Sequence, residues 1–206
     1  GTEEYYSCDT LLLSVGLIPE NELTRGLGAD VSRVTSGPEV NDHLETSVPG
    51  VFACGNVLHV HDLVDYVSEE AAMAGQAAAE YVKELEEREK CAEKTDAETS
   101  ALGDGEEVPT SEGHQSLVRL SAENGVRYTV PQYLDPKHMK DQIIVRFRVD
   151  NVYKNRSISV YYDGVKIQTR KKRVMAPGEM EQVILKKDSF GDYPDLKKIT
   201  ICTEEA

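Results

Sequence analysis

The sequence contains no tryptophan, three phenylalanines and four cysteines among its 206 residues. The cysteines are scattered and form no Cys-x-x-Cys pair; they are Cys8, Cys54, Cys91 and Cys202. This spacing favours neither a zinc site nor a redox-active disulfide, and Cys54 is best explained as a small buried thiol. No apolar run approaches the roughly 20 residues that a membrane-spanning helix needs, so we expect a cytoplasmic protein without a membrane span.

A second absence concerns phosphate binding. A Gly-x-Gly-x-x-Gly loop after a strand binds the pyrophosphate of a dinucleotide, and the sequence has no such loop. Gly26 and Gly28 are the nearest candidates, but no third glycine follows and no apolar strand precedes them. The chain by itself therefore lacks the usual site for the phosphates of a dinucleotide.

Charge is distributed unevenly along the chain, whose formal net charge is −14. Residues 1–88 carry 17 acidic and 4 basic side chains, whereas residues 117–206 carry 12 acidic and 17 basic ones. The basic segment suits a domain that docks against an acidic surface, either of this chain or of another subunit. Its strongest cluster, residues 170–173, is typical of a solvated strand end or a docking surface. Four further basic residues are expected on the same side: Arg146, Arg148, Lys154 and Arg156. The overall acidity argues against nucleic acid as a partner.

Residues 46–56, TSVPGVFACGN, are the most informative stretch. A Pro-Gly turn precedes the short apolar run at 51–54, which ends at Gly55 shortly before a long Ala-rich helical pattern. We predict a strand, a tight turn and a helix. A glycine lets the backbone approach a ligand closely, and a helix N-terminus offers unpaired N–H groups. The arrangement predicts a site for an anionic or carbonyl-bearing ligand.

The helical pattern covers residues 62–88, where apolar and small residues recur at helical spacing. Asp65 is a candidate for the N-cap position. The backbone N–H groups of Tyr66, Val67 and Ser68 would then be free to face a ligand. An ordinary packing helix is the alternative interpretation.

Residues 46–56 resemble the C-terminal FAD-binding motif of the pyridine nucleotide-disulfide oxidoreductases, with Asn56 where that motif ends in Asp. Residues 8–23 are similar to another late motif of the family, and residues 56–82 resemble FAD subunits related to anaerobic glycerol-3-phosphate dehydrogenase and amine oxidases. The resemblance covers about residues 1–88. It implies electron or hydride transfer through FAD, with NAD(P)H as a second cofactor. It also implies cofactor contacts from Gly55, Asn56, Asp65, Tyr66 and Val67.

His59 and His61 suggest a metal site together with Asp62, because two side chains spaced by two on a strand share a face. No third nitrogen or sulfur ligand lies at a suggestive spacing, so we predict no metal. The resemblance places this loop near the flavin, which makes either histidine a candidate proton donor or substrate contact.

The remaining chain divides into distinct parts. The apolar run at 10–15 predicts a buried strand. Residues 89–116 are polar and acidic, and they predict a flexible linker. From residue 117 apolar residues alternate with polar ones, and Asp163-Gly164 predicts a tight hairpin. We count about seven short strands, which predict a small antiparallel β-sandwich of immunoglobulin-like type.

The expected fold class is therefore α+β. Residues 1–88 form a partial FAD/NAD(P)-binding, Rossmann-like segment, residues 89–116 the linker and residues 117–206 the sandwich. Because the phosphate loops are absent, the resemblance implies the C-terminal part of a larger FAD-dependent oxidoreductase. Its partners would be the N-terminal FAD/NAD(P)-binding lobes, with another subunit or a second copy as a further class. The alternative is a non-catalytic binding or scaffold module that acts through the basic sandwich.

Overall fold

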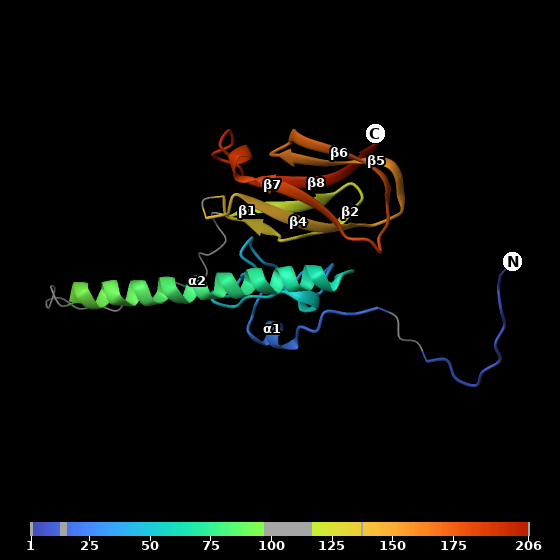
Figure 1. Cartoon of the computed structure of the whole chain (residues 1–206), viewed down its shortest axis with the longest axis horizontal. Helices are drawn as coiled ribbons and strands as arrows, with labels where there is room; N and C mark the ends of the chain where they lie inside the picture. The colour runs from blue at the N-terminus through green and yellow to red at the C-terminus, as the bar shows by residue number, and fades with distance from the viewer. Residues whose placement is uncertain (1, 13–15, 97–116, 137, 206) are drawn as a thin grey trace.

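The structure is a computed structural model that describes residues 2–12, 16–96, 117–136 and 138–205 (Figure 1). It confirms mixed helix and strand content. The helical elements are α1 (Glu22–Gly26), the 3-10 helix η1 (Gly55–Val57), α2 (Val64–Asp96) and the 3-10 helix η2 (Lys187–Phe190). The strands are β1 (Val118–Glu123), β2 (Val126–Val130), β3 (Tyr133–Leu134), β4 (Gln142–Val149), β5 (Tyr153–Tyr162), β6 (Val165–Met175), β7 (Glu181–Lys186) and β8 (Lys198–Glu205).

The strands form two sheets that share one core. The first has the order β3-β1-β8-β5-β6 and the second the order β2-β4-β7. Val145 and Phe147 of β4, Tyr162 of β5, and Ile199 and Ile201 of β8 are fully buried in this core. The alternation of apolar and polar residues along each strand produces this arrangement, because successive side chains point to opposite faces.

One strand pair departs from the predicted antiparallel arrangement. β1 and β8 run parallel, with Leu120 opposite Ile199, whereas the other strand pairs of the described chain are antiparallel. These two strands come from opposite ends of the domain, so no hairpin turn fixes their relative direction. The prediction of a wholly antiparallel sandwich is wrong at this pair, and the immunoglobulin-like type stays a prediction.

The predicted hairpin at Asp163-Gly164 is confirmed. It joins β5 to β6, and Tyr162 pairs with Val165 across it. The φ angles are 43° at Asp163 and 88° at Gly164. Positive φ at both central residues is the backbone that a two-residue hairpin of type I′ needs, and it explains why Asp-Gly is favoured there.

The part of the chain from Val40 to Ala74 lies against the second sheet and covers its outer face. Figure 1 shows α2 running between the sheets and α1. A second apolar cluster joins Val40, Leu44, Leu58 and Ala74 to Val130 of β2. As a result, both faces of β4 are covered. The face that carries its polar residues Arg146 and Arg148 is the interface with α2 and the loop before it.

The predicted buried strand at 10–15 is wrong for residues 10–12. Leu11 and Leu12 are 73% and 91% exposed, and the chain there is extended and leads away from the other elements (Figure 1). A strand needs a neighbour for its backbone N–H and C=O groups, and the described chain places none beside this segment. Residues 13–15 of this prediction lie outside the described residues.

The prediction of a strand and then a helix over 46–56 also needs correction. Phe52 makes only an isolated bridge to Glu45, and η1 and a loop separate Gly55 from the start of α2 at Val64. Pro38 and Val40, upstream of this stretch, likewise make only isolated bridges.

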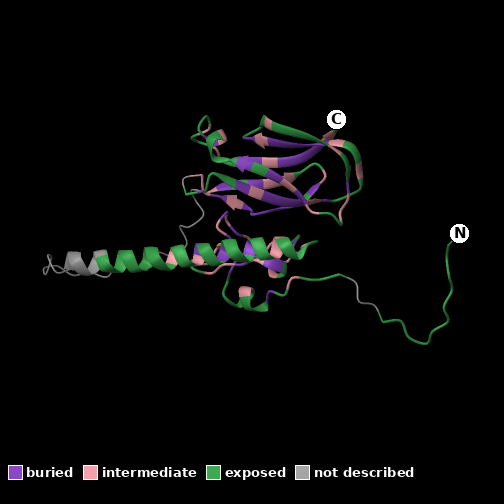
Figure 2. Ribbon diagram, in the orientation of Figure 1, coloured by how far each residue is buried: buried purple, intermediate pink, exposed green. Residues whose placement is uncertain are grey.

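The helices lie close to their predicted positions. α1 corresponds to the helical piece that residues 23–28 predict. α2 continues to Asp96 and so takes up the first part of the predicted linker, while residues 97–116 lie outside the described residues. Beyond Tyr81, the part of α2 whose burial is described is exposed (Figure 2). Neither α1 nor α2 has, in its described residues, the length and hydropathy of a membrane-crossing helix.

The hairpin gives a first testable prediction. A Cβ at Gly164 or at Gly178 would meet no atom within 4 Å, but only Gly164 has a left-handed backbone, at φ +88°. We expect Gly164→Ala to lower the free energy of unfolding by about 1 kcal/mol or more, since an L-residue is strained there. Gly178→Ala is the matched control and should change it by less. Urea unfolding followed by far-UV circular dichroism measures both, and equal effects would contradict the backbone argument.

Candidate functional site

Gly55 forms the turn on which the site is built. It opens η1 with φ +71°, a conformation that favours glycine. Its backbone N–H donates to Glu70 Oε2 at 3.0 Å, and a Cβ on Gly55 would lie 3.2 Å from Val67 Cγ1. The glycine therefore serves close packing of the turn against α2, and its N–H is already engaged.

The first turn of α2 contains the other predicted site residues. The helix begins at Val64, so Asp65 is its second residue rather than the predicted N-cap, and it is exposed. Tyr66 and Val67 are half-buried, and the Tyr66 ring centroid lies 4.9 Å from the Arg146 guanidinium carbon. The first backbone N–H groups of a helix have no partner within it. In a helix that begins at Val64 these include the N–H of Tyr66 but not that of Val67, whose N–H is the first to bond within the helix.

Asn56 lies beside this turn and is exposed. Its side-chain Oδ1 accepts a hydrogen bond from the His61 backbone N–H at 3.1 Å. The structure thus brings Gly55, Asn56 and Val67 together around one turn, while Asp65 lies at the exposed start of the helix.

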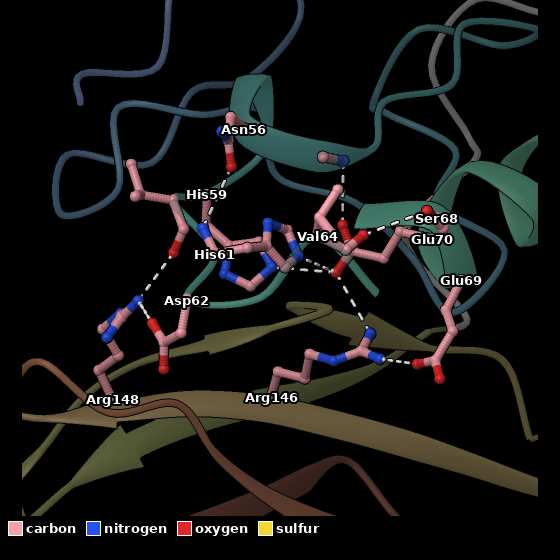
Figure 3. Close-up of polar contacts among 12 residues, drawn as sticks. Asn56, His59, His61, Asp62, Val64, Ser68, Glu69, Glu70, Arg146 and Arg148 are labelled. Atoms are coloured by element: carbon pink, nitrogen blue, oxygen red, sulfur yellow. Dashed lines mark hydrogen bonds and ion pairs between the residues drawn. The ribbon is translucent and has the colours of Figure 1, made fainter. Parts of the chain in front are cut away.

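Glu70, which the sequence reasoning missed, is the centre of the cluster in Figure 3. Its carboxylate is buried, and His59 Nε2 lies 3.0 Å and His61 Nε2 2.8 Å from Oε1. Arg146 Nη1 of β4 lies 3.3 Å from the same oxygen. Three side chains, two from the loop and one from β4, therefore meet at the carboxylate of Glu70 in α2.

The electrostatics keep this carboxylate ionised. Burial alone would raise the pKa of Glu70, but the close contacts of its carboxylate with His59 and His61 outweigh burial and lower the pKa to about 2. Burial lowers the pKa of His59, which favours its neutral imidazole. The pKa of the Cys54 thiol is raised, by burial and then by the Glu70 charge. A thiolate is thus disfavoured at Cys54, in keeping with its interpretation as a packed thiol.

Sequence spacing did contain a signal for Glu70. Glu70, Ala74 and Ala77 are the buried residues among positions 64–90 of α2, and they are spaced as one helical face. An acidic residue on the apolar face of a helix must find a buried partner. That partner, Arg146, is 76 residues away in sequence, so spacing could not identify it.

Residues 1–81 match the family model for pyridine nucleotide-disulphide oxidoreductases. The match contains the Gly55 turn, the three side chains of the cluster that come from the loop and α2, and the first turns of α2. It supports a pyridine nucleotide-disulphide oxidoreductase-like family for this part, which we call the oxidoreductase-like segment. It does not extend to the sandwich. No solved structure matches the chain.

Two arginines of β4 fasten the sandwich to the oxidoreductase-like segment. Besides Glu70, Arg146 contacts Glu69 Oε2 through Nη2 at 2.6 Å. Arg148 pairs with the Asp62 carboxylate and donates to the Val60 carbonyl at 3.0 Å. Within the described chain, the basic domain thus docks on acidic residues of the same chain.

The basic cluster at 170–173 lies elsewhere. Arg170 and Lys172 of β6 pair with Glu181 of β7, at 3.7 and 2.9 Å. Of the residues expected beside this cluster, Arg156 of β5 lies directly opposite Lys172. Arg146 and Arg148 belong to the other sheet and pair with Glu70 and Asp62 instead, so they do not join the cluster.

The buried pair gives a second prediction. Arg146→Met should lower the free energy of unfolding by about 3 kcal/mol, because it leaves the Glu70 charge buried with less compensation. Arg173→Met, at an exposed position of β6, is the matched control and should change it by about 0.5 kcal/mol or less. Urea unfolding of both variants gives the comparison.

A double variant tests the coupling directly. Adding Glu70→Gln to Arg146→Met should recover part of the loss, since the unpaired charge is then removed. If the two single changes were simply additive, the pair would not be the source of the stabilisation.

Proposed function

We propose that residues 1–88 complete the FAD-binding domain of an NAD(P)-linked oxidoreductase, and that the β-sandwich braces this domain or covers its active site. The observation that carries the proposal is the family match over residues 1–81 together with the Gly55 turn, which packs directly on the first turn of α2. The family typically binds FAD and NAD(P). FAD would supply the electron or hydride transfer, and this chain would bind and orient it.

The residues present fit this role through two groups. The N–H groups that a helix beginning at Val64 leaves without an internal partner, which include that of Tyr66, suit a carbonyl or an anionic edge. The N–H of Val67 is the first to bond within the helix, so Val67 would contribute only through its side chain. Negative charge that develops on a cofactor is stabilised by such preorganised donors. Asn56 is exposed beside them and can hydrogen-bond without bringing a charge. The Gly55 N–H does not take part, because it donates to Glu70.

Exposed apolar side chains near the start of the chain support the existence of further protein contacts. Leu11, Leu12, Leu17, Ile18 and Leu23 are each more than 60% exposed, and a series of large exposed apolar side chains is common where another protein surface binds. N-terminal FAD/NAD(P)-binding lobes would cover them in the proposed enzyme. A second subunit or a second copy of the chain is the other class of partner.

The sandwich contributes through its contacts with the oxidoreductase-like segment. Arg146 and Arg148 fix the loop and helix that follow the Gly55 turn. A role in assembly or in covering the site follows from this position, and an immunoglobulin-like connectivity is part of the proposal. The alternative, a non-catalytic binding or scaffold module, rests on the exposed Lys171 and Arg173 of the edge strand β6.

FAD binding by the 206-residue chain provides a third prediction. We expect no stoichiometric FAD after gel filtration of the chain mixed with FAD, measured by flavin absorbance, because the chain has no Gly-x-Gly-x-x-Gly loop. An immunoblot of source-cell lysate with an antibody against residues 117–206 should then show a band well above 22.8 kDa. Stoichiometric FAD on the chain, or a band only at its own size, would favour the alternative.

Asn56 offers the sharpest substitution test. Gly55→Val would strain the left-handed backbone and crowd Val67 whether or not a cofactor is bound. A loss of flavin in this variant would therefore not report on cofactor contacts alone. In the protein with a complete FAD domain, Asn56→Asp should retain flavin, since the carboxylate keeps an acceptor. Asn56→Leu should weaken FAD affinity about tenfold through the lost hydrogen bond.

The control for this fourth prediction is Asn151→Leu, at an exposed turn of the sandwich. FAD dissociation constants are measured by fluorescence titration of the deflavinated protein. Equal affinity in the Asn56→Leu and Asn151→Leu variants would remove Asn56 from the cofactor site.

A further inference from the structure

Three buried side chains converge between the loop and α2 in a way that the proposed oxidoreductase does not require. The coordinating atoms of His59, His61 and Glu70 all lie within 4.8 Å of one another. Both Nε2 atoms face the same carboxylate oxygen, Oε1, at 3.0 Å from His59 and 2.8 Å from His61 (Figure 3). Each of the three side chains is about 1 to 2% exposed.

The histidine nitrogens are poorly satisfied by the protein alone. His61 Nε2 is buried and makes no hydrogen bond, since its close contact with Glu70 lacks hydrogen-bond geometry. The Nδ1 atoms of His59 and His61 are also buried without a hydrogen-bond partner. Buried polar atoms are normally paired, and an unpaired one in a native protein points to an ion, a water or a functional role.

We propose that His59, His61 and Glu70 bind one divalent transition-metal cation through the two Nε2 atoms and Oε1. Two imidazoles and one carboxylate form a ligand set that Zn²⁺ and similar cations use. Metal–ligand distances of about 2.1 Å place neighbouring ligand atoms about 3.0 Å apart at a right angle and about 3.4 Å apart at a tetrahedral angle. The observed separations of 2.8 and 3.0 Å are close to the lower value.

The third ligand, Glu70, could not be identified from the sequence. His59 and His61 lie in the loop, whereas Glu70 reaches the site from the second turn of α2. Asp62, which the sequence suggested as a ligand, pairs with Arg148 instead. The cation would tie the loop to the helix beside the Gly55 turn, because Glu70 Oε2 also accepts the Gly55 N–H.

The charged groups beside the site have both signs: Glu69 and Glu70 attract a cation, whereas Arg146 repels it. With neutral imidazoles, Glu69, Glu70 and Arg146 sum to −1, and a divalent cation changes this sum to +1. Arg146 keeps Glu69 as its partner at 2.6 Å, but its Nη1 lies 3.3 Å from the Glu70 ligand oxygen. Removal of the Arg146 charge should therefore tighten metal binding.

The experiment uses the 206-residue chain, stripped of metal with a chelator and dialysed. Zn²⁺ is titrated by calorimetry and Co²⁺ by visible absorption. We expect one equivalent of either cation and a visible cobalt spectrum typical of nitrogen and oxygen ligands. His59→Ala and His61→Ala should each lower the affinity about 100-fold or more, since they remove a ligand. His138→Ala, an exposed histidine that pairs with Asp135 at 2.6 Å, is the matched control and should bind like the wild type.

Circular dichroism will show whether the histidine variants fold. If they do not, a second variant keeps the test decisive. Arg146→Met should bind Zn²⁺ more tightly than the wild type does. The proposal is overturned if the wild type binds no equivalent of either cation, or if His61→Ala binds as tightly as His138→Ala. Unchanged or weaker binding by a folded Arg146→Met variant would overturn it as well. FAD takes no part in these measurements, so their outcome is independent of the proposed oxidoreductase.

Discussion

A carboxylate as deeply buried as Glu70 needs compensating charge or hydrogen-bond donors, because an isolated ion in a protein interior is very costly. Here the donors come from three separate parts of the chain. The Gly55 N–H and the histidines of the loop approach from one side, and Arg146 of β4 approaches from the other. The position of this one charge therefore relates the turn, the start of α2 and the second sheet to one another.

The two arginines of β4 give the sandwich a direct part in the candidate site. Val145 and Phe147 hold β4 in the sandwich core, so the opposite face presents Arg146 and Arg148 at fixed positions toward α2. The buried small residues of α2, Ala74 and Ala77, allow the helix to approach closely. Figure 2 shows burial concentrated in the sandwich and in the part of the chain beneath it. The oxidoreductase-like segment and the sandwich thus share an interface made of both apolar and ionic contacts.

Local signals predicted the elements whose conformation depends on neighbouring residues. The Asp163-Gly164 hairpin follows from the positive φ that these residues tolerate. The existence of α2 follows from its helical periodicity. The buried strand at 10–15 was predicted wrongly for residues 10–12, because a strand depends on a partner that local composition does not specify. The strand predicted at 51–54 depends on a partner in the same way, and only Phe52 makes a bridge there.

The sequence by itself determined the positions of most strands, the long helix and the turn at Gly55, together with the family motif around it. Those features depend on residues that are close together along the chain. Only the tertiary structure decided that Glu70 is the centre of the site, since Arg146 lies 76 residues beyond it. It also decided that the outer face of β4 is an interface rather than a solvated surface. Contacts at such separation form because folding brings two buried charges together, and no local pattern of residues encodes which distant partner each will meet.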